Sequence, residues 1–356
     1  MSTESDSLSL LSIISLASFF TFFAVSKFSN KIGNGVLLDR DFEKPQAFHK
    51  ELVPRSGGLA AIVSSTIFFI LYYFLFEKLL YDYLILSIAI FFLGFLEDIK
   101  LKISPSHRLI LMMAVLIFFI FFFSIGIKGI DVYFLSTWMK NSIFSTAFVL
   151  ICFLFIINGA NLIDGFNGLL TIHLLIVNII LAFLNFNNGN QDLGWIIIAQ
   201  IVILFSFLVF NFPKAKMFMG DSGSYLFGSL VALNVIKTNN LNPETSSFFF
   251  CILLFYLFFE VFFSFFRKLY LRRSPLKPDN RHLHMLLYDF LKKSKKFKDP
   301  NHINSTIINL VYIFLIFPAF FFTDNGIICR YLFFLLLIIY LLFYFSLYGF
   351  QKKYTK

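Results

Sequence analysis

The sequence predicts an all-α, polytopic integral membrane protein with about eleven transmembrane helices. Hydrophobic residues make up 58% of its 356 residues and charged residues only 14%, whereas ordinary soluble domains carry roughly 45–50% and about 25%. The apolar residues gather in windows long enough to cross a bilayer as helices of about 20 residues. The segments between these windows alternate between many and few basic residues, as the loops of multispanning proteins do.

The expected spans follow one another along the whole chain. Their ranges are 7–29, 57–76, 80–96, 108–127, 142–158, 168–186, 194–210, 221–236, 247–266, 306–323 and 327–349. The first run has neither a basic segment before it nor a small-residue cleavage site after it, so we expect a span and not a cleaved signal peptide. We treat residues 1–356 as one transmembrane domain with a cytoplasmic, histidine-containing loop at about 267–305.

The basic residues predict an N-terminus outside and a C-terminus in the cytoplasm. With this topology the inside connections and the C-terminal tail hold 25 Lys and Arg residues, and the outside connections hold 5. The net charge of +10 is then explained by topology and by attraction to anionic lipids and substrates, and not by binding of nucleic acid. The three scattered cysteines favour neither a disulfide framework nor a CxxC metal site.

A polar motif, NGANLIDGFNGLL, separates the fifth and sixth expected spans. Asn158, Asn161, Asp164 and Asn167 recur every three residues, a spacing that places side chains on one face of a helix. Its glycines allow the backbone to turn and to approach a ligand. The pattern predicts a surface for a metal-bound phosphate or a sugar, and the alternative is an ordinary polar turn.

A second motif, NFPKAKMFMGDSGS, runs from Asn211 into the eighth expected span. Its Asp221 stands at a predicted helix start, where anionic ligands bind but where an aspartate can also be a simple cap. The neighbouring Lys214 and Lys216 suit a phosphorylated ligand and argue against a role as a cap alone.

Two further groups of acids lie at or in the spans. Glu97 and Asp98 end the third span. Adjacent carboxylates repel each other, which suits either a base or a metal site, and the alternative is an ordinary interfacial charge pair. Glu260 is an acid inside a span, which is a functional-site hypothesis by default, although it could simply pair with a neighbouring base.

The most basic loop carries Arg281, His282 and His284. Histidine can move protons or hold phosphate, whereas a zinc site is disfavoured because no cysteine lies nearby. The alternative is an exposed pair of loop histidines. The segment 285–297 that follows is basic and amphipathic, so it either lies on the membrane surface or packs against the protein.

Lys44 and Arg55 precede the second span, which opens with Gly57 and Gly58. The two glycines permit close helix approach, and the two basic residues either bind phosphate or only determine topology. All five motifs lie at span ends on the predicted cytoplasmic face, so we expect them to form one site.

In combination these motifs resemble the polyprenyl-phosphate N-acetylhexosamine-1-phosphate transferases, over nearly the whole chain. The resemblance implies transfer of a sugar 1-phosphate, by default of GlcNAc, from a UDP-sugar to undecaprenyl phosphate. UMP is released and synthesis of a cell-surface polysaccharide begins. It further implies a bacterial cytoplasmic membrane protein with its active site on the cytoplasmic face, Mg²⁺ as cofactor with Mn²⁺ as an alternative, and a homodimer as one oligomeric option.

The resemblance also implies roles for individual residues. Asp221, helped by Asn161, looks like the Mg²⁺ ligand. The implied catalytic residues are Glu97, Asp98, Asp164, His282 and His284. The implied substrate-binding residues are Asn158, Asn161, Asn167, Asn211, Phe218, Lys44, Arg55 and Arg281. Among them, Phe218 resembles the ring that stacks on uracil, and Asp98 the acid near the attacking lipid phosphate.

This chain departs from the family pattern at three positions, which leave the sugar open between GlcNAc and a 6-deoxy N-acetylhexosamine. Glu97 stands for an aspartate, Asn167 for a second carboxylate and Met285 for a third histidine. A transporter or lipid flippase is the rival reading, and it predicts ionisable groups near the bilayer midplane and two repeated halves. An inactive homologue would be expected to lose Asp221 or Asp164.

Overall fold

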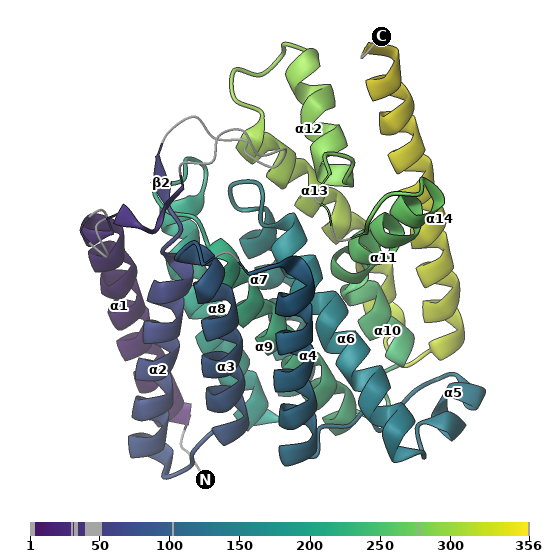
Figure 1. The fold of residues 1–356 in the computed structure, drawn as a ribbon. Coiled ribbons are helices and arrows are strands. Elements are labelled where there is room, and N and C mark those ends of the chain that lie inside the picture. The colour runs from purple at the N-terminus through teal and green to yellow at the C-terminus, as the bar shows by residue number, and fades with distance from the viewer. Residues whose placement is uncertain are drawn as a thin grey trace.

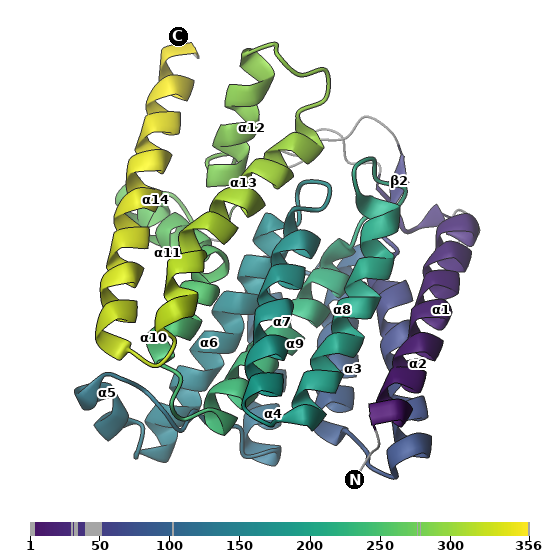
Figure 2. The same cartoon turned by 180° about the vertical axis from the view of Figure 1, so that it is seen from behind.

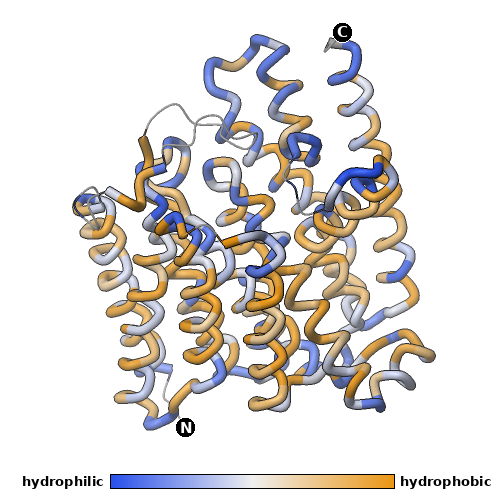
Figure 3. The backbone as a smooth tube through the Cα atoms, in the orientation of Figure 1, coloured by the Kyte–Doolittle hydropathy of each residue, from blue (hydrophilic) through white to orange (hydrophobic). Residues whose placement is uncertain are grey.

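The computed structural model describes residues 4–29, 31, 35–39, 52–101, 103–275, 277 and 279–354. Its helices run roughly side by side in one bundle, and the N- and C-terminal ends of the chain lie at opposite ends of it (Figures 1 and 2). Hydrophobic residues dominate the middle of the bundle, while hydrophilic residues gather at its two ends (Figure 3). This distribution is the one that a bilayer requires.

The bundle consists of long helices joined by short connections. The helices are α1 (Glu4–Phe28), α2 (Gly57–Phe76), α3 (Tyr81–Asp98), α4 (Pro105–Phe122), α5 (Tyr133–Trp138), α6 (Ser142–Ile163), α7 (Leu169–Asn187), α8 (Gln191–Asn211), α9 (Gly220–Leu241), α10 (Ser247–Leu253), α11 (Phe255–Tyr270), α12 (Leu283–Lys293), α13 (Asn301–Ile316), the 3₁₀ helix η2 (Phe317–Phe322) and α14 (Gly326–Tyr354). Two-residue strands, β1 (Leu38–Asp39) and β2 (Val53–Pro54), pair antiparallel near the end of the bundle that carries the C-terminus.

Each expected span coincides with a helix or, in one case, with the bent pair α10–α11. Eight helices of the described part are long and apolar enough to cross a membrane, and the pair α10–α11, bent by 75°, adds a ninth crossing if it is one span. The protein is therefore a multi-pass, all-α membrane protein, as predicted. The count of eleven spans and the side on which each terminus lies stay predictions.

The helix α9 runs through the centre of the bundle, where it packs against α2, α3, α6 and α7 and buries almost its whole length. A polar network fixes its middle: Asn234 accepts a hydrogen bond from the Tyr83 hydroxyl (2.8 Å) and donates to Gln200 (2.7 Å) and Asn178 (3.2 Å). Polar groups in hydrocarbon need partners within the protein. The network therefore ties α3, α7 and α8 to α9.

Two glycines bring neighbouring helices into backbone contact with the start of α9. A Cβ atom on Gly94 of α3 would lie 2.4 Å from the Asp221 carbonyl oxygen, and one on Gly58 of α2 would lie 2.2 Å from the Ser222 hydroxyl oxygen. Both distances are far below van der Waals contact. Only glycine permits this approach, which is the role that the sequence suggested for Gly58.

The predicted loop at 267–305 is largely helical. It contains the end of α11, all of α12 and the start of α13. The leucines and the methionine of α12 are buried, and the helix packs against α13 and α14. Of the two alternatives for the segment 285–297, the structure therefore selects packing against the protein for its helical part.

We expect Gly94→Ala to lower the unfolding free energy of the detergent-solubilised protein by about 1–3 kcal/mol, because it inserts a methyl group into a closed backbone contact. Gly349→Ala is the matched control, since a Cβ atom on Gly349 meets nothing within 4 Å. Thermal unfolding followed by tryptophan fluorescence measures both. Equal midpoints for the two variants would contradict the close approach of α3 to α9.

Candidate active site

The start of α9 is held by Asp98, the last residue of α3. The Asp98 carboxylate accepts hydrogen bonds from the backbone N–H of Asp221 (3.0 Å), from the backbone N–H of Ser222 (2.9 Å) and from the Ser222 hydroxyl. It is only 1% exposed. The first N–H groups of a helix lack partners within the helix and carry partial positive charge. Asp98 therefore caps α9 from a neighbouring helix.

The turn into α9 depends on Gly220, whose φ of +75° lies in the left-handed region. A Cβ atom there would stand 2.7 Å from either carboxylate oxygen of Asp98. Both the backbone conformation and the close approach require glycine. This explains why a glycine precedes Asp221 in the motif.

Arg108 bridges two acids at this point. One terminal nitrogen of its guanidinium lies 3.4 Å from a Glu97 oxygen and 3.5 Å from an Asp221 oxygen. We call Glu97, Asp98, Arg108 and Asp221 the carboxylate cluster. Arg108 is not among the predicted site residues, because its partner Asp221 is 113 positions away in the sequence.

Asn161 joins the carboxylate cluster from α6. Its side-chain nitrogen donates to Asp221 (3.0 Å) and to the Ser224 hydroxyl (3.1 Å). Asn158, one turn earlier, instead donates to the Leu154 carbonyl of its own helix (2.8 Å). The structure therefore brings Asn161 to Asp221, whereas the Asn158 amide donates within α6.

The expected single helix face from Asn158 to Asn167 is wrong, because α6 ends at Ile163. Asp164 is the residue after the helix, and it is half-buried. Burial, the Asp221 carboxylate and the Asp98 carboxylate raise the pKa of Asp164 well above its ordinary value, and Arg55 opposes the rise. Negative charge is thus concentrated where α6, α3 and α9 meet.

Asn167, before α7, and Asn211, at the end of α8, stabilise the turns next to these helices by hydrogen bonds. The Asn167 backbone N–H donates to Asn301 of α13 (2.8 Å), and its side chain donates to the Pro213 carbonyl (2.9 Å). Asn211 accepts from the Gly168 N–H (2.6 Å) and donates to the Met217 carbonyl (2.9 Å). Both side chains hold the segment 212–219 against the α6–α7 turn.

Residues 54–58 run alongside Phe218 and Met219. The Phe218 N–H donates to Pro54, and the Phe218 carbonyl accepts from Gly57 (2.8 and 2.9 Å). Between these contacts, Arg55 makes an ion pair with the buried Asp39 (3.0 Å). The predicted substrate-binding residue Lys44 lies outside the described residues.

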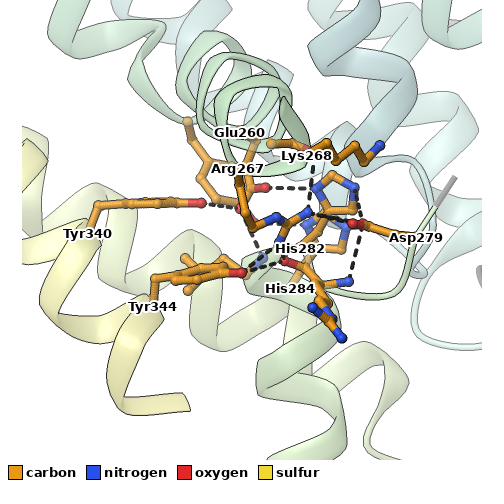
Figure 4. Close-up of polar contacts among 12 residues, drawn as sticks. Glu260, Arg267, Lys268, Asp279, His282, His284, Tyr340 and Tyr344 are labelled. Carbon is orange, nitrogen blue, oxygen red and sulfur yellow. Dashed lines mark hydrogen bonds and ion pairs between the residues drawn. The ribbon is translucent and has the colours of Figure 1, made fainter. Parts of the chain in front are cut away.

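His282 is enclosed by carboxylates (Figure 4). Its Nδ1 lies 3.1 Å from a Glu260 oxygen and its Nε2 lies 3.3 Å from an Asp279 oxygen. Arg267 in turn binds Asp279 (2.8 Å). Glu260 therefore does pair with a base, and that base is a histidine of the predicted site. We call residues 279–284 the histidine loop.

His284 lies beside His282, with the two rings parallel and their centroids 5.5 Å apart. Its Nδ1 is 3.1 Å from the Tyr256 hydroxyl, and its Nε2 is buried without a hydrogen-bond partner in the described part of the chain. Burial lowers the pKa of His284 to about 3, so its ring is neutral at pH 7. The ring contacts Phe166 of the α6–α7 turn (5.8 Å between centroids), which connects the loop to Asp164 and Asn167.

Arg281 turns toward α14, where its guanidinium lies 5.6 Å from the Tyr348 ring centre. The Arg281 carbonyl accepts hydrogen bonds from Arg267 and from Tyr344. The backbone of the histidine loop is thus fixed by α11 and α14. Arg267 and these tyrosines carry no motif in the sequence and were not selected there.

The side chains that could bind a cation at this end of the bundle come together two at a time. Within the residues that the structure describes, no three His, Cys, Asp or Glu side chains converge to hold a metal ion. At the carboxylate cluster, the Asn161 side chain brings an amide to the Asp221 carboxylate. Because the Asn161 atom in this contact is the amide nitrogen, which donates, the oxygen atoms that this pair offers to a cation as it stands are those of the Asp221 carboxylate.

Comparison with known proteins shows which families and relatives the chain is similar to. Residues 80–239 match the sequence pattern described as glycosyl transferase family 4. The chain is similar to the undecaprenyl-phosphate alpha-N-acetylglucosaminyl 1-phosphate transferase of Thermotoga maritima, with 28% identity over 289 residues that cover 80% of this chain and 81% of that protein. Both similarities agree with the family that the motifs resemble, and residues 80–239 are the part of the chain that matches glycosyl transferase family 4.

The chain is also similar to two phospho-N-acetylmuramoyl-pentapeptide-transferases. That of Anoxybacillus flavithermus is 28% identical over 217 residues, which cover 55% of this chain and 64% of that protein. That of Streptococcus pneumoniae is 28% identical over 234 residues, which cover 63% and 69%. The family 4 match contains the whole carboxylate cluster, whereas the histidine loop lies beyond it.

The raised pKa of Asp164 predicts a pH-dependent stability. The folded state keeps the proton of Asp164 to a higher pH than the unfolded chain, so the unfolding free energy falls as pH rises from about 4 through the native pKa. Asp164→Asn resembles the protonated form and removes this loss. It should raise the thermal midpoint at pH 8 and leave it nearly unchanged at pH 4. The gain in unfolding free energy at pH 8 is about 1.4 kcal/mol for each unit by which the pKa is raised. Asp192→Asn, in an exposed ion pair with Lys78, is the control. A destabilised Asp164→Asn at pH 8 would contradict the assignment.

Proposed function

We propose that this membrane transferase moves a sugar 1-phosphate from a UDP-sugar to undecaprenyl phosphate, releases UMP and so starts the synthesis of a cell-surface polysaccharide. One observation carries the proposal: Asp221 lies at the N-terminus of α9 between the Asn161 amide and the Arg108 guanidinium. An acid, an amide and a base thus meet at one point. Because Asp98 already accepts from the first N–H groups of α9, the guanidinium of Arg108 is the group there that suits a phosphate. The name of the Thermotoga maritima relative supports this substrate class.

In the proposed reaction, a phosphate oxygen of the lipid forms a bond to the sugar-linked phosphorus of the UDP-sugar. The bond from that phosphorus to the bridging oxygen breaks, and the oxygen leaves with UMP. A phosphate monoester already carries about 1.5 to 2 negative charges at pH 7, so the attack needs no strong base. The main obstacle is repulsion between two anions, and catalysis is mostly positioning and neutralisation of charge.

The proposed role of Asp98 follows from its contacts. Its carboxylate accepts hydrogen bonds from the first turn of α9, which favours a positioning role over that of a base. In the alternative mechanisms, Asp98 either deprotonates the lipid phosphate or carries the phosphoryl group in a two-step reaction. Arg108 makes an ion pair with Asp221, and Arg55 interacts electrostatically with Asp221 and Asp98, so we assign the phosphates to these two arginines.

We propose Mg²⁺ as the cofactor, held by Asp221 with Asn161. Rotation of the Asn161 amide would turn its oxygen toward Asp221 and offer a second oxygen ligand. Burial and, after it, the Asp221 carboxylate raise the pKa of Asp164, and a divalent cation held by Asp221 would offset the repulsion between these two acids. When bound, the ion would neutralise charge on the pyrophosphate, and Mn²⁺ would suit the same oxygen donors.

For the nucleotide we propose stacking of uracil on Phe218, whose backbone is fixed by residues 54 and 57. Asn211 would act by holding this segment through the Met217 carbonyl. His284 is the histidine with a nitrogen left for the pyrophosphate. GlcNAc is the proposed sugar, and a 6-deoxy N-acetylhexosamine is the alternative. The sugar stays open between these two because Glu97, Asn167 and Met285 differ from the family pattern in or beside the motifs.

We place the site on the cytoplasmic face of a bacterial membrane, because UDP-sugars are made in the cytoplasm and the basic connections predict that side. The rival function is a transporter or a lipid flippase without transferase activity. It would require ionisable groups that lead across the bilayer. The network at the middle of α9 instead consists of a phenol and three amide side chains.

The decisive experiment incubates the purified protein in detergent with undecaprenyl phosphate, Mg²⁺ and a panel of UDP-sugars. We expect UMP and a lipid-linked sugar with one of them, and loss of the reaction on chelation of Mg²⁺. Asp221→Ala should reduce turnover by more than about a hundredfold, as loss of a key electrostatic group does.

Asp192→Ala is the matched control, because Asp192 is exposed and pairs with Lys78, away from the carboxylate cluster. It should retain wild-type turnover. If no UDP-sugar gives UMP, the proposed function is wrong. If Asp221→Ala retains full turnover, the metal assignment is wrong.

A further inference from the structure

The buried acid of α11, Glu260, is not part of any sequence motif, yet it lies at the centre of a polar cluster (Figure 4). It is 1% exposed. A buried carboxylate is costly unless hydrogen-bond donors surround it. One of its oxygens accepts from the Leu283 backbone N–H (3.1 Å) and from the Tyr340 hydroxyl (2.8 Å), and the other faces His282.

The contact to Leu283 has the geometry of a helix cap. Leu283 is the first residue of α12, and α12 has no side-chain cap of its own. Glu260 therefore supplies an acceptor to the first turn of α12 from α11, and at the same time it holds the histidine that precedes this turn. A single carboxylate fixes both the backbone and a side chain of the histidine loop.

His282 has little left to offer a ligand. Its Nδ1 faces Glu260 and its Nε2 faces Asp279. Ionised carboxylates only accept hydrogen bonds, so Nδ1 must carry a proton to bond to Glu260. Asp279 is itself held by Arg267, which makes a displacement of this partner costly.

His284 presents the opposite situation. Tyr256 occupies its Nδ1, while its Nε2 has no partner in the described chain although the residue is fully buried. A buried polar atom without a partner costs roughly 1–3 kcal/mol. Its ring lies parallel to that of His282, so His282, together with the Tyr256 hydroxyl at Nδ1, helps to set where Nε2 lies.

We propose that Glu260 is the positioning residue of the histidine loop: it fixes His282 and the start of α12, so that His284 alone keeps a ring nitrogen for the pyrophosphate of a nucleotide-sugar. His282 is then also a positioning residue. This inference rests on the proposed function for the identity of the ligand, but the arrangement of protons and contacts is independent of it.

The test is Glu260→Gln, which preserves size and an acceptor for Leu283 and Tyr340 but turns an N–H donor toward His282. Nδ1 of His282 must then lose its proton and accept. Nitrogen NMR of protein labelled with ¹⁵N in the histidine rings reads this directly, and His282→Gln identifies the signal. We expect a protonated Nδ1 in the wild type and an unprotonated one in Glu260→Gln. A wild-type Nδ1 without a proton would overturn the proposal, even if the variant failed to fold.

The second measurement is the transferase rate with UDP-GlcNAc and undecaprenyl phosphate, or with the UDP-sugar that gives the most UMP. We expect Glu260→Gln to lower kcat/KM by about 10- to 100-fold, as loss of a histidine's supporting partner commonly does. Glu244→Gln, at an exposed acid between α9 and α10, should match the wild type. Wild-type kinetics in Glu260→Gln would overturn the proposal. Absence of turnover in the wild type itself would instead refute the proposed function, and the NMR result would still decide the role of Glu260.

Discussion

The Asp98 carboxylate at the first turn of α9 is the contact on which the arrangement of the site depends. It accepts hydrogen bonds from the N–H groups of Asp221 and Ser222. The N-cap residue of α9 provides no side-chain cap of its own. Gly220 and Gly94 make room for it by bringing α3 into backbone contact with α9. Once α9 starts at this point, Asp221 lies between Asn161 and Arg108, and the carboxylate cluster is complete.

The same device occurs a second time, at the histidine loop. Neither α9 nor α12 has a side-chain cap from its own N-cap residue. In each case a buried carboxylate from a neighbouring helix accepts from the first turn, Asp98 for α9 and Glu260 for α12. A carboxylate suits the positive end of a helix dipole, and the low polarity of the surroundings strengthens the attraction. Two helix starts that face substrate in the proposed function are thereby fixed from the membrane-spanning bundle.

Much of the fold was predictable from sequence because the bilayer imposes a length and a composition on each span. The windows around α1, α2 and α6 to α8 therefore agree closely with the helices. The motifs of the site were predictable from the sequence, but the contacts between their residues were not. Arg108 meets Asp221, and Glu260 meets His282, across separations of 113 and 22 residues that no periodicity records. The motif from Asn158 was misjudged as one helix face because its regular spacing continues beyond Ile163, where α6 ends and the chain turns.

Hydrogen–deuterium exchange at the start of α9 tests the central role of Asp98 most directly. In Asp98→Ala the buried amides of Asp221 and Ser222 lose their acceptor, which costs roughly 1–3 kcal/mol, so exchange in the peptide that covers residues 218–226 should accelerate by about tenfold or more. Exchange in the middle of α14, which lies elsewhere in the bundle, should stay unchanged. Undiminished protection of residues 218–226 in the variant would show that α9 is held by other contacts and would contradict the account.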